Sequence, residues 1–349
     1  MQVGISLLTL VPRISGGSET YARELVRALG RVGEHSYRVL LPSIASDVEG
    51  LPTEIVDEYR AARSMPGRIV AMTEGVVRGR RLRRRLSGLD VVHFPLTVMI
   101  PRVATPPTVV TVLDLQHEFL PQFFSRGELA YRRAVYGWSI RRSRLVVTIS
   151  GHAARAVVER YSVPESRVRP IHLGLDHTVF RPGDDARGQF LVYPARAWPH
   201  KNHERLFVAF AELRRRHPDL ELLLTAYEGE TPPGVRSLGH VSRDELVGLY
   251  RTAAGLVFPS LYEGFGQPPL EAMACGCPVA SSDAAALPEV CGDGARLFDP
   301  TSVEAMVEAV EDILARPDDW RARGLARAAG FSWEKTARAH DDAYAAAMG

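Results

Sequence analysis

Glu263 and Glu271 stand eight positions apart, with a Gly-Phe-Gly turn and two prolines between them. Proline is tolerated in a first helical turn, so a helix is expected to begin before Glu271. Gly264 and Gly266 allow close approach to the backbone amides, and a helix N-terminus attracts anionic groups. The carboxylates of Glu263 and Glu271 can accept hydrogen bonds from ligand hydroxyls. The segment therefore predicts a site for an anionic, hydroxyl-rich ligand. On spacing alone, a strand–turn–helix with two solvated acids remains the alternative.

Two further loops are suited to phosphate. Gly16 and Gly17 precede a predicted helix, where glycine backbone amides and a helix N-terminus come together. In the second half, Arg196 and Lys201 follow an apolar strand at 190–193, and two cations there would neutralise a diphosphate.

Lys201 stands out because lysine is rare in this chain. Of 43 Lys and Arg residues, Lys201 and Lys335 are the only lysines. A compact ammonium fits where a planar guanidinium cannot, which favours a specific role for Lys201 in the loop. Chance retention is the alternative.

Alternating strands and helices must position these loops. The helix at 18–29 has apolar residues at helical spacing, and Gly30 is expected to end it. The alternation predicts doubly wound α/β structure. Apolar runs predict strands at Val3–Leu8, Arg38–Leu41, Asp90–Phe94, Thr108–Leu113, Leu145–Ile149, Phe190–Tyr193, Leu220–Thr225, Leu256–Phe258, Pro278–Ser281 and Arg296–Phe298.

The alternation breaks once, at a polar Gly/Pro-containing linker over 174–187. We therefore expect two Rossmann-like domains, 1–173 and 188–332, facing across a cleft. The final segment, 333–349, is predicted to be a helix that packs back on the N-terminal domain. Sites in such folds lie off the carboxyl ends of the strands. A dinucleotide-dependent oxidoreductase lacks support, because no G-x-G-x-x-G follows a strand.

Composition is that of an ordinary globular protein, with 46% hydrophobic and 24% charged residues. The start of the chain reads as a strand and not a signal peptide, and no apolar run is long enough to span a membrane. Three cysteines make no disulfide framework, and Cys275 and Cys277 lack the second ligand pair of a zinc site. These features favour a reducing cytoplasm.

Charge is unevenly distributed, with a net of +9 over residues 1–180 and −7 over the remainder. A dense arginine run extends from Arg78 to Arg85. Such a helical face could contact anionic lipid at the inner face of a membrane, or an anionic acceptor. A solvated helix is the alternative, and nucleic-acid binding is not expected because no known module accompanies the run.

Taken together, these segments resemble the GT-B fold retaining glycosyltransferases of family 4, and the resemblance covers nearly the whole chain. Gly16-Gly17 matches the glycine loop of that family. Arg196, Lys201 and Asn202 match its R-x4-K-N phosphate motif. The segment 263–271 matches its E-x7-E motif. The stretches around Ser150, Gly174 and Asp176 resemble its interdomain segments, and residues 285–290 resemble its loop beyond the helix that carries Glu271. These five matching segments in the right order make the resemblance specific.

The resemblance implies a nucleotide-sugar donor with a GDP, UDP or dTDP carrier, held in the second domain, and an acceptor held in the first. Glu271 would bind the ribose diol, and Glu263 with the amides of Gly264, Phe265 and Gly266 would face the donor sugar and phosphate. The acceptor would be a hydroxyl, and a lipid-linked hydroxyl is one candidate. Polysaccharide, glycolipid or glycoconjugate synthesis would be the setting.

One position departs from the family pattern. Leu113 stands where the family often has a histidine, and leucine cannot donate a hydrogen bond. Asp114 follows, and His117 is near in sequence, so both are candidate catalytic residues beside Arg196, Lys201 and Glu263. A packed or solvated histidine is the alternative for His117.

The implied reaction is glycosyl transfer with retention of configuration, in which fixed cations stabilise the departing diphosphate. The acceptor hydroxyl would attack on the face that the phosphate leaves. The chain contains no Asp-x-Asp, so neither a metal nor another cofactor is expected. A GT-B fold epimerase and a catalytically weak nucleotide-sugar-binding subunit are the rival interpretations.

Overall fold

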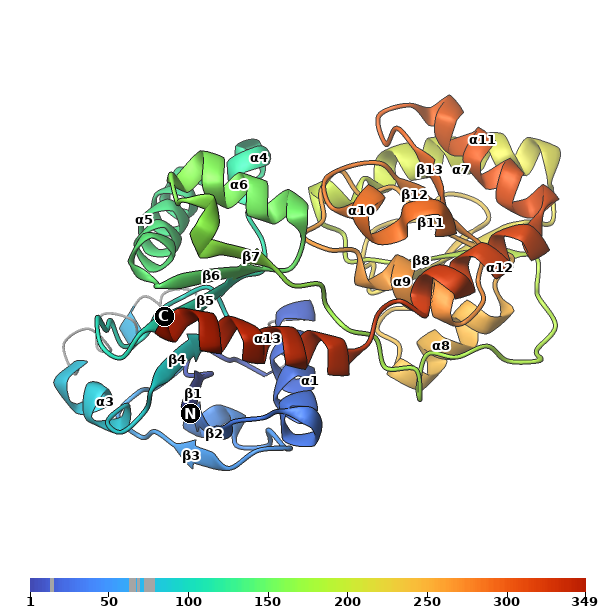
Figure 1. Ribbon diagram of the computed structural model, residues 1–349. Helices are drawn as coiled ribbons and strands as arrows, with labels where there is room; N and C mark the ends of the chain where they lie inside the picture. The colour runs from blue at the N-terminus through green and yellow to red at the C-terminus, as the bar shows by residue number, and fades with distance from the viewer. Residues whose placement is uncertain (13–15, 63–66, 68–69, 72–78) are drawn as a thin grey trace. The chain divides into compact units, whose positions relative to one another are not determined.

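The computed structural model divides the chain between Gly174 and Leu175 into two compact units (Figure 1). Unit 1 is residues 1–174 with 333–349, and unit 2 is residues 175–332. The described residues are 1–12, 16–62, 67, 70–71 and 79–349.

Unit 1 is built on a seven-stranded parallel sheet of order β3-β2-β1-β4-β5-β6-β7. The central strands are buried at every position, as in a sheet with helices on both faces. The strands are β1 Gln2–Ser6, β2 Ser36–Leu41, β3 Thr53–Ile55, β4 Val91–Phe94, β5 Thr108–Val112, β6 Leu145–Thr148 and β7 Val168–Pro170. The helices are α1 Gly17–Val32, α3 Gly79–Arg85, α4 Gln116–Phe119, α5 Arg126–Arg142, α6 Gly151–Tyr161 and α13 Trp333–Met348.

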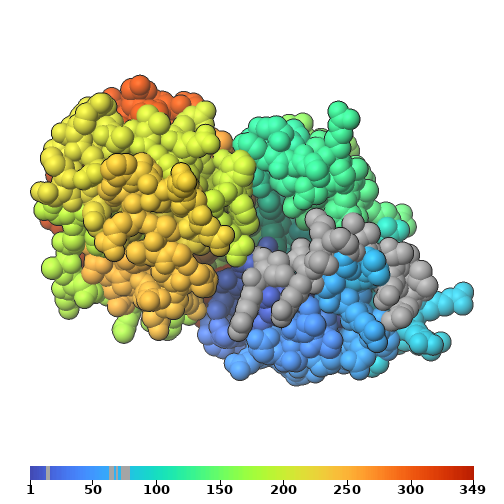
Figure 2. All heavy atoms as spheres, turned by 180° about the vertical axis from the view of Figure 1, so that it is seen from behind, coloured from blue at the N-terminus to red at the C-terminus, as the bar shows by residue number. Residues whose placement is uncertain are grey.

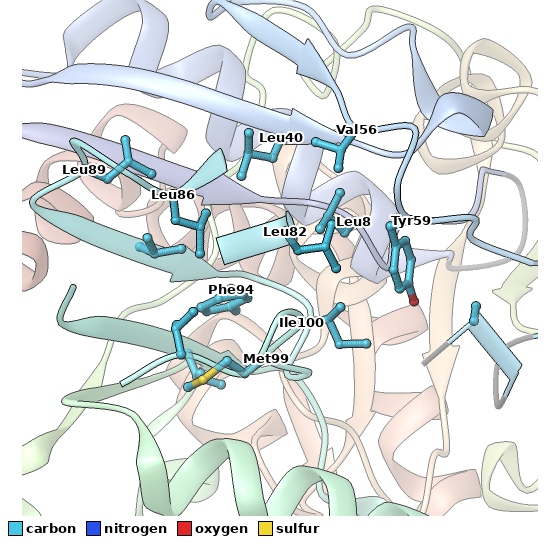
Figure 3. Close-up of a cluster of buried hydrophobic side chains, with 14 residues drawn as sticks. Leu8, Leu40, Val56, Tyr59, Leu82, Leu86, Leu89, Phe94, Met99 and Ile100 are labelled. Carbon is cyan, nitrogen blue, oxygen red and sulfur yellow. The ribbon is translucent and has the colours of Figure 1, made fainter. Parts of the chain in front are cut away.

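The arginine-rich helix α3 is anchored to the core of unit 1 by two leucines. Leu82 in α3 and Leu86 just after it are buried in a cluster that includes Leu8 and Phe94 (Figure 3). Burial of the leucine side chains fixes which face of α3 is inside. The arginines at 80–81 and 83–85 are therefore left on the exposed face.

Helix α13 packs beside α1 and against β4, β5 and β6 (Figure 1). A fully buried polar network joins it to the sheet. His93 bonds to Tyr344 at 2.9 Å and to Thr111 at 2.7 Å, while Tyr21 bonds to Thr111 and to His340 at 2.9 Å each. Buried polar groups are costly unless paired, so this network fixes the position of α13 on unit 1.

Unit 2 repeats the same architecture with a six-stranded parallel sheet of order β10-β9-β8-β11-β12-β13. Residues of α7 and of the stretch from β9 to α8, coloured yellow to gold, form much of its surface on the face in Figure 2. The strands are β8 Phe190–Pro194, β9 Glu221–Thr225, β10 Val235–Ser237, β11 Gly255–Phe258, β12 Val279–Ser282 and β13 Arg296–Phe298. The helices are α7 His203–Arg216, α8 Arg243–Thr252, α9 Gln267–Ala274, α10 Leu287–Cys291, α11 Val303–Ala315 and α12 Pro317–Ala328.

The predicted α/β class and all ten predicted strands are confirmed, with ends that shift by one or two residues. The prediction for Gly30 is wrong, because α1 continues to Val32 and Gly33 follows it. A Cβ on Gly30 would lie 2.0 Å from the Gly50 carbonyl oxygen. Gly30 is therefore required by a close backbone approach and does not terminate the helix.

Candidate active site

The candidate donor site of unit 2 lies where the strand order reverses. β8 has β9 on one side and β11 on the other, so the loops after β8 and β11 leave the sheet at the same edge. Ligands of doubly wound folds bind at this topological switch point, off the carboxyl ends of the strands. Arg196 and Lys201 come from the first loop, and Glu263 from the second.

Lys201 and Glu263 form an ion pair across these two loops. The Lys201 Nζ donates to Glu263 Oε1 at 2.6 Å, and both side chains are only about 15% exposed. The ammonium also lies 5.6 Å from the centre of the Phe258 ring. A short, partly desolvated ion pair holds both groups in defined positions, so a ligand meets an already organised cation and anion.

The turn after Glu263 is shaped by close packing. Gly266 has a φ of 122° and precedes α9, and a Cβ there would lie 2.7 Å from Leu287. Phe265 is buried and meets Phe331 edge to face. The phenyl ring of Phe265 is thus an anchor of the turn, and a ligand at Gly264–Gly266 would contact backbone.

Glu271 lies on α9, about one turn after the helix start at Gln267. Part of its side chain is accessible, yet its carboxyl lies among protein atoms. Burial raises the pKa of Glu271 from 4.5 to about 8, against opposing effects of Arg243, Tyr250 and Gln267. Hydrogen bonds donated by ligand hydroxyls would favour the charged carboxylate and replace the water that burial has removed.

Asn202 follows Lys201 and is held by hydrogen bonds to other segments of unit 2. Its side-chain amide donates to the carbonyl oxygens of Pro259 and Pro300 at 3.0 and 2.8 Å. Its Oδ1 accepts from Arg205, and its backbone has a φ of 61°. The Asn202 side chain thus ties the loop after β8 to the segments that follow β11 and β13.

In unit 1, Gly16 and Gly17 begin α1 after β1, at the corresponding switch point between β1 and β4. Gly16 caps the helix, and among the described residues no atom lies within 4 Å of a Cβ built on Gly16 or Gly17. Ser15, the residue before these glycines, lies outside the described residues.

Asp114 follows β5 and stabilises the short helix α4. Its Oδ1 accepts from the Gln116 backbone N–H at 2.5 Å. Leu113 lies between this residue and the strand, and its backbone N–H donates to Thr97. The Asp114 side chain is partly exposed.

His117 is fully buried within unit 1. Its Nε2 lies 3.1 Å from the Tyr161 hydroxyl, and its ring meets Phe124 and Tyr136 edge to face. Burial lowers the pKa of His117 from 6.5 to about 4, although Glu118 opposes this effect. The imidazole is thus a neutral side chain that packs among aromatic residues.

Two residues near the site were not predicted from the sequence. Arg243 starts α8, acts electrostatically on Glu271 and lies 3.8 Å from Asp176. Trp198 lies between Arg196 and Lys201 and is 50% exposed. The capping box Ser242–Glu245 indicates the start of α8. Nothing in the sequence connects Arg243, at that start, to Glu271.

Searches for metal and membrane features give negative results over the described part of the chain. No group of three or more His, Cys, Asp or Glu residues there could hold a metal ion. Among the same residues, no helix combines the length and apolar character needed to cross a bilayer. The described cysteines, Cys275, Cys277 and Cys291, are buried and free.

This fold and these loops define a two-unit GT-B protein of the glycosyltransferase class. The sequence profile of the Glycosyl transferases group 1 matches residues 178–326, and that of Glycosyltransferase Family 4 matches residues 15–179. The O-antigen chain mannosyltransferase B of Escherichia coli is 31% identical over 268 residues, which cover 68% of this chain and 69% of that protein. The chain belongs to glycosyltransferase family 4, whose members transfer sugars.

Solved structures share the whole fold at low sequence identity. Sucrose-phosphate synthase from Thermosynechococcus elongatus has a TM-score of 0.78 and 20% identity, covering 99% of this chain and 98% of that one. HepE of Anabaena, in complex with UDP-glucose, has a TM-score of 0.75 and 16% identity, covering 99% and 100%. The GT-B prediction is therefore confirmed over the full length.

Proposed function

We propose that this protein is a retaining glycosyltransferase that moves a hexose from a nucleoside diphosphate sugar to a hydroxyl of a saccharide acceptor. The ion pair between Lys201 and Glu263 at the switch point of unit 2 is the observation that carries the proposal. It would supply one cation and one hydrogen-bond acceptor to a bound sugar diphosphate. UDP-glucose in HepE and the mannosyltransferase name of the Escherichia coli relative support a donor of this class.

The positive groups would act on the leaving diphosphate. As the bond between sugar and phosphate breaks, negative charge grows on the phosphate, and fixed cations stabilise that charge in a site poor in water. Lys201 already occupies a defined position, and Arg196 is exposed on the same loop. The diphosphate would then compete with Glu263 for the Lys201 ammonium, which frees the Glu263 carboxylate for the sugar hydroxyls.

Glu271 would recognise the ribose of the donor. Its carboxyl can accept bonds from two adjacent hydroxyls, and they would replace the water that burial has removed. The backbone of Gly264, Phe265 and Gly266 would face the phosphate from the start of α9. Unit 2 is thus proposed as the donor domain and unit 1 as the acceptor domain.

The proposed mechanism uses side-chain cations in place of a metal. Arg196 and Lys201 supply the charge that a metal ion bound to an Asp-x-Asp motif supplies in other glycosyltransferases. The acceptor hydroxyl would attack on the face from which the phosphate departs, and that phosphate would take the proton. Asp114 is proposed to orient the acceptor. His117 is proposed to support the segment that carries Asp114.

We propose further that the acceptor is lipid-linked and is handled at the cytoplasmic face of a membrane. Arg80, Arg81 and Arg84 are exposed on α3. Arg85 pairs with Glu54 and Glu58, and Arg81 acts electrostatically on Glu58. Exposed guanidinium groups on one anchored helix suit a surface of anionic lipid. Arg78, the start of the predicted basic run, lies outside the described residues.

A catalytically weak nucleotide-sugar-binding subunit is a second candidate. Leu113 replaces the histidine that the family often carries, and His117 is buried. Such a protein would bind the nucleotide but neither hydrolyse nor transfer the sugar. A GT-B fold epimerase would instead convert the free donor without an acceptor.

The experiment that tests the proposal compares the two lysines of the chain. Nucleotide binding is first measured by thermal shift with GDP, UDP, dTDP and ADP, because a ligand of the native state raises the melting temperature. Loss of a charge-assisted contact costs about 1.5–3 kcal/mol, so Lys201→Ala should reduce transfer about ten- to a hundredfold. Lys335→Ala, exposed on α13, is the matched control and should match wild type. Wild-type kinetics in Lys201→Ala would refute the phosphate assignment.

A further inference from the structure

The indole of Trp198 is exposed in the loop between β8 and α7, which also carries Arg196 and Lys201. Trp198 is 50% exposed, whereas Trp320 and Trp333 are 7% and 3% exposed. Leaving an indole in water forgoes one of the largest gains that a side chain makes on burial. An exposed tryptophan between two candidate phosphate cations therefore requires an explanation.

Two backbone hydrogen bonds fix the turn that presents Trp198. The Trp198 N–H donates to the Arg196 carbonyl at 2.7 Å, and the Lys201 N–H donates to the Trp198 carbonyl at 2.8 Å. Pro199 follows Trp198 directly and begins a short 3₁₀ helix, where its fixed φ limits the freedom of the chain. The side chains of Arg196 and Trp198 thus leave a defined stretch of backbone.

His200 anchors the same turn to the rest of unit 2. Its ring is buried and packs beside the indole, with the two ring centres 5.7 Å apart. Its carbonyl accepts from the Leu261 N–H at 2.8 Å, in the loop after β11. Burial lowers the pKa of His200 from 6.5 to about 4, so this ring is uncharged at neutral pH. His200 therefore does not compete with a cation for the indole.

The guanidinium of Arg196 lies over this indole, with 5.5 Å between the guanidinium carbon and the ring centre. That separation is within the range of an attractive cation–π contact. Arg196 is itself exposed, and an exposed arginine otherwise samples many rotamers. A guanidinium can stack on an aromatic face and still present the N–H donors in its plane to a phosphate.

We propose that Trp198 is a positioning residue for Arg196, whose guanidinium the indole holds in place before the donor diphosphate binds. This role rests on the proposed function of the Lys201 site and adds a residue that the R-x4-K-N motif leaves unspecified. A side chain that is ordered in advance loses less conformational entropy on binding, so the diphosphate binds more tightly. A cation that is fixed in advance also stabilises the leaving diphosphate without reorganisation.

The two cations of the site would then be ordered in different ways. Lys201 is held by Glu263 at 2.6 Å, and a diphosphate has to compete with that carboxylate for the ammonium. Arg196 is held by an indole, which has no hydrogen-bond acceptor and so does not compete with a phosphate for the guanidinium donors. Loss of the indole should therefore lower the affinity through Arg196 alone.

The test is a double-mutant cycle on nucleotide affinity. Calorimetric titration of the full-length protein with GDP, UDP, dTDP and ADP identifies the diphosphate that binds most tightly. Its affinity is then measured in Trp198→Ala, in Arg196→Ala and in the double variant. Arg323→Ala is the matched control, because Arg323 is also an exposed arginine of unit 2 and lies over the Trp320 indole at 5.1 Å.

Trp198→Ala should weaken binding of the diphosphate about fivefold, which corresponds to roughly 1 kcal/mol. In the Arg196→Ala background the same change should have no further effect, because the guanidinium that the indole positions is gone. Trp198→Phe keeps an aromatic face and should bind within about twofold of wild type, whereas Trp198→Leu should behave as Trp198→Ala does. Arg323→Ala should bind as wild type. Without ligand, every Trp198 variant should melt as wild type does, since this side chain is exposed.

Three outcomes overturn the inference. The first is wild-type affinity for the diphosphate in Trp198→Ala. The second is an equal loss from Trp198→Ala with and without Arg196, because the indole would then act independently of the guanidinium. The third is equal affinity in Trp198→Phe and Trp198→Leu. If none of the four diphosphates binds the wild-type protein, the proposed function itself fails, and that result is distinct from a diphosphate that binds with an additive cycle.

Discussion

Replacement of Glu271 by glutamine should make unit 2 more stable at neutral and alkaline pH. Burial raises the pKa of Glu271 from 4.5 to about 8 in the folded chain. Between these two values the folded protein retains a proton that the unfolded chain has lost. Stability is therefore full below pH 4.5, falls as the pH rises through this window, and levels off above pH 8.

The size of the effect follows from the shift. At about 1.36 kcal/mol per pKa unit, Glu271 lowers the free energy of unfolding by roughly 3 kcal/mol at neutral pH. Above the pKa of the folded state, it lowers this free energy by roughly 5 kcal/mol. Glutamine has nearly the same shape and carries no titrating proton, so this cost disappears. For a folding unit of this size, about 3 kcal/mol corresponds to a rise in melting temperature of about 6–12 °C.

Differential scanning calorimetry from about pH 5 to about pH 9 can separate the transitions of the two units and measure this slope. The difference between Glu271→Gln and wild type should be near zero at the acid end and should grow with pH. Glu228→Gln, on the exposed loop after β9, is the matched control and should follow wild type throughout. Parallel curves for Glu271→Gln and wild type, or a mutant less stable at alkaline pH, would refute the reasoning.

The same substitution should weaken nucleotide binding while it stabilises the fold. Glutamine accepts fewer hydrogen bonds from a diol than a carboxylate does. These hydrogen bonds are lost in the ground state and in the transition state alike. Calorimetric titration with the diphosphate should show affinity that rises toward pH 8 in wild type and stays flat in Glu271→Gln. Opposite signs for stability and binding are expected only if Glu271 lies in the ligand site.

Three further predictions address other parts of the chain. Transfer should persist in excess EDTA, because Arg196 and Lys201 carry the phosphate charge; complete loss restored by magnesium or manganese would contradict this. Replacing Arg81 and Arg84 by glutamine should abolish binding to anionic vesicles at low salt. The Debye length is about 8 Å at physiological ionic strength and longer at low salt, so electrostatic attraction to the vesicle is strongest there. Nucleotide affinity should not change in that variant, and a wild-type chain that ignores such vesicles would favour a soluble acceptor. Burial lowers the pKa of His340 from 6.5 to about 4, so unit 1 should lose stability as the pH falls through this window. His340→Gln should flatten that fall in calorimetry, and an unchanged slope would show that His340 does not carry it.

The long buried strands could be predicted because both faces of each are covered. Strands such as β5 and β6 are apolar at nearly every position, which is a signal that one sequence displays directly. The missed strands β3, β7 and β10 are three residues long and lie at or next to sheet edges. Their polar, exposed positions give no periodicity, because only their neighbours in the sheet define them as strands.

The candidate site could be predicted in its residue types but not in its contacts. The spacing of Glu263 and Glu271 indicated a ligand loop, yet the partner of Glu263 is 62 residues away in sequence. That pairing depends on β8 and β11 lying side by side, which is a property of the sheet order. His117 had two interpretations on sequence grounds, catalytic or packed, and its burial among residues from other elements could not be read from one sequence.

The shared strand order explains why we assign the diphosphate to unit 2. In each unit the first strand stands at the switch point, and the loop after it is the place where an anion is expected. Unit 1 offers Gly16 and Gly17 there, whose backbone amides carry only partial charges. Unit 2 offers Arg196 and Lys201, which carry full charges. A leaving diphosphate gains more negative charge during the reaction, and full positive charges respond more strongly to that change, so the donor is expected on unit 2 and the less charged acceptor group on unit 1.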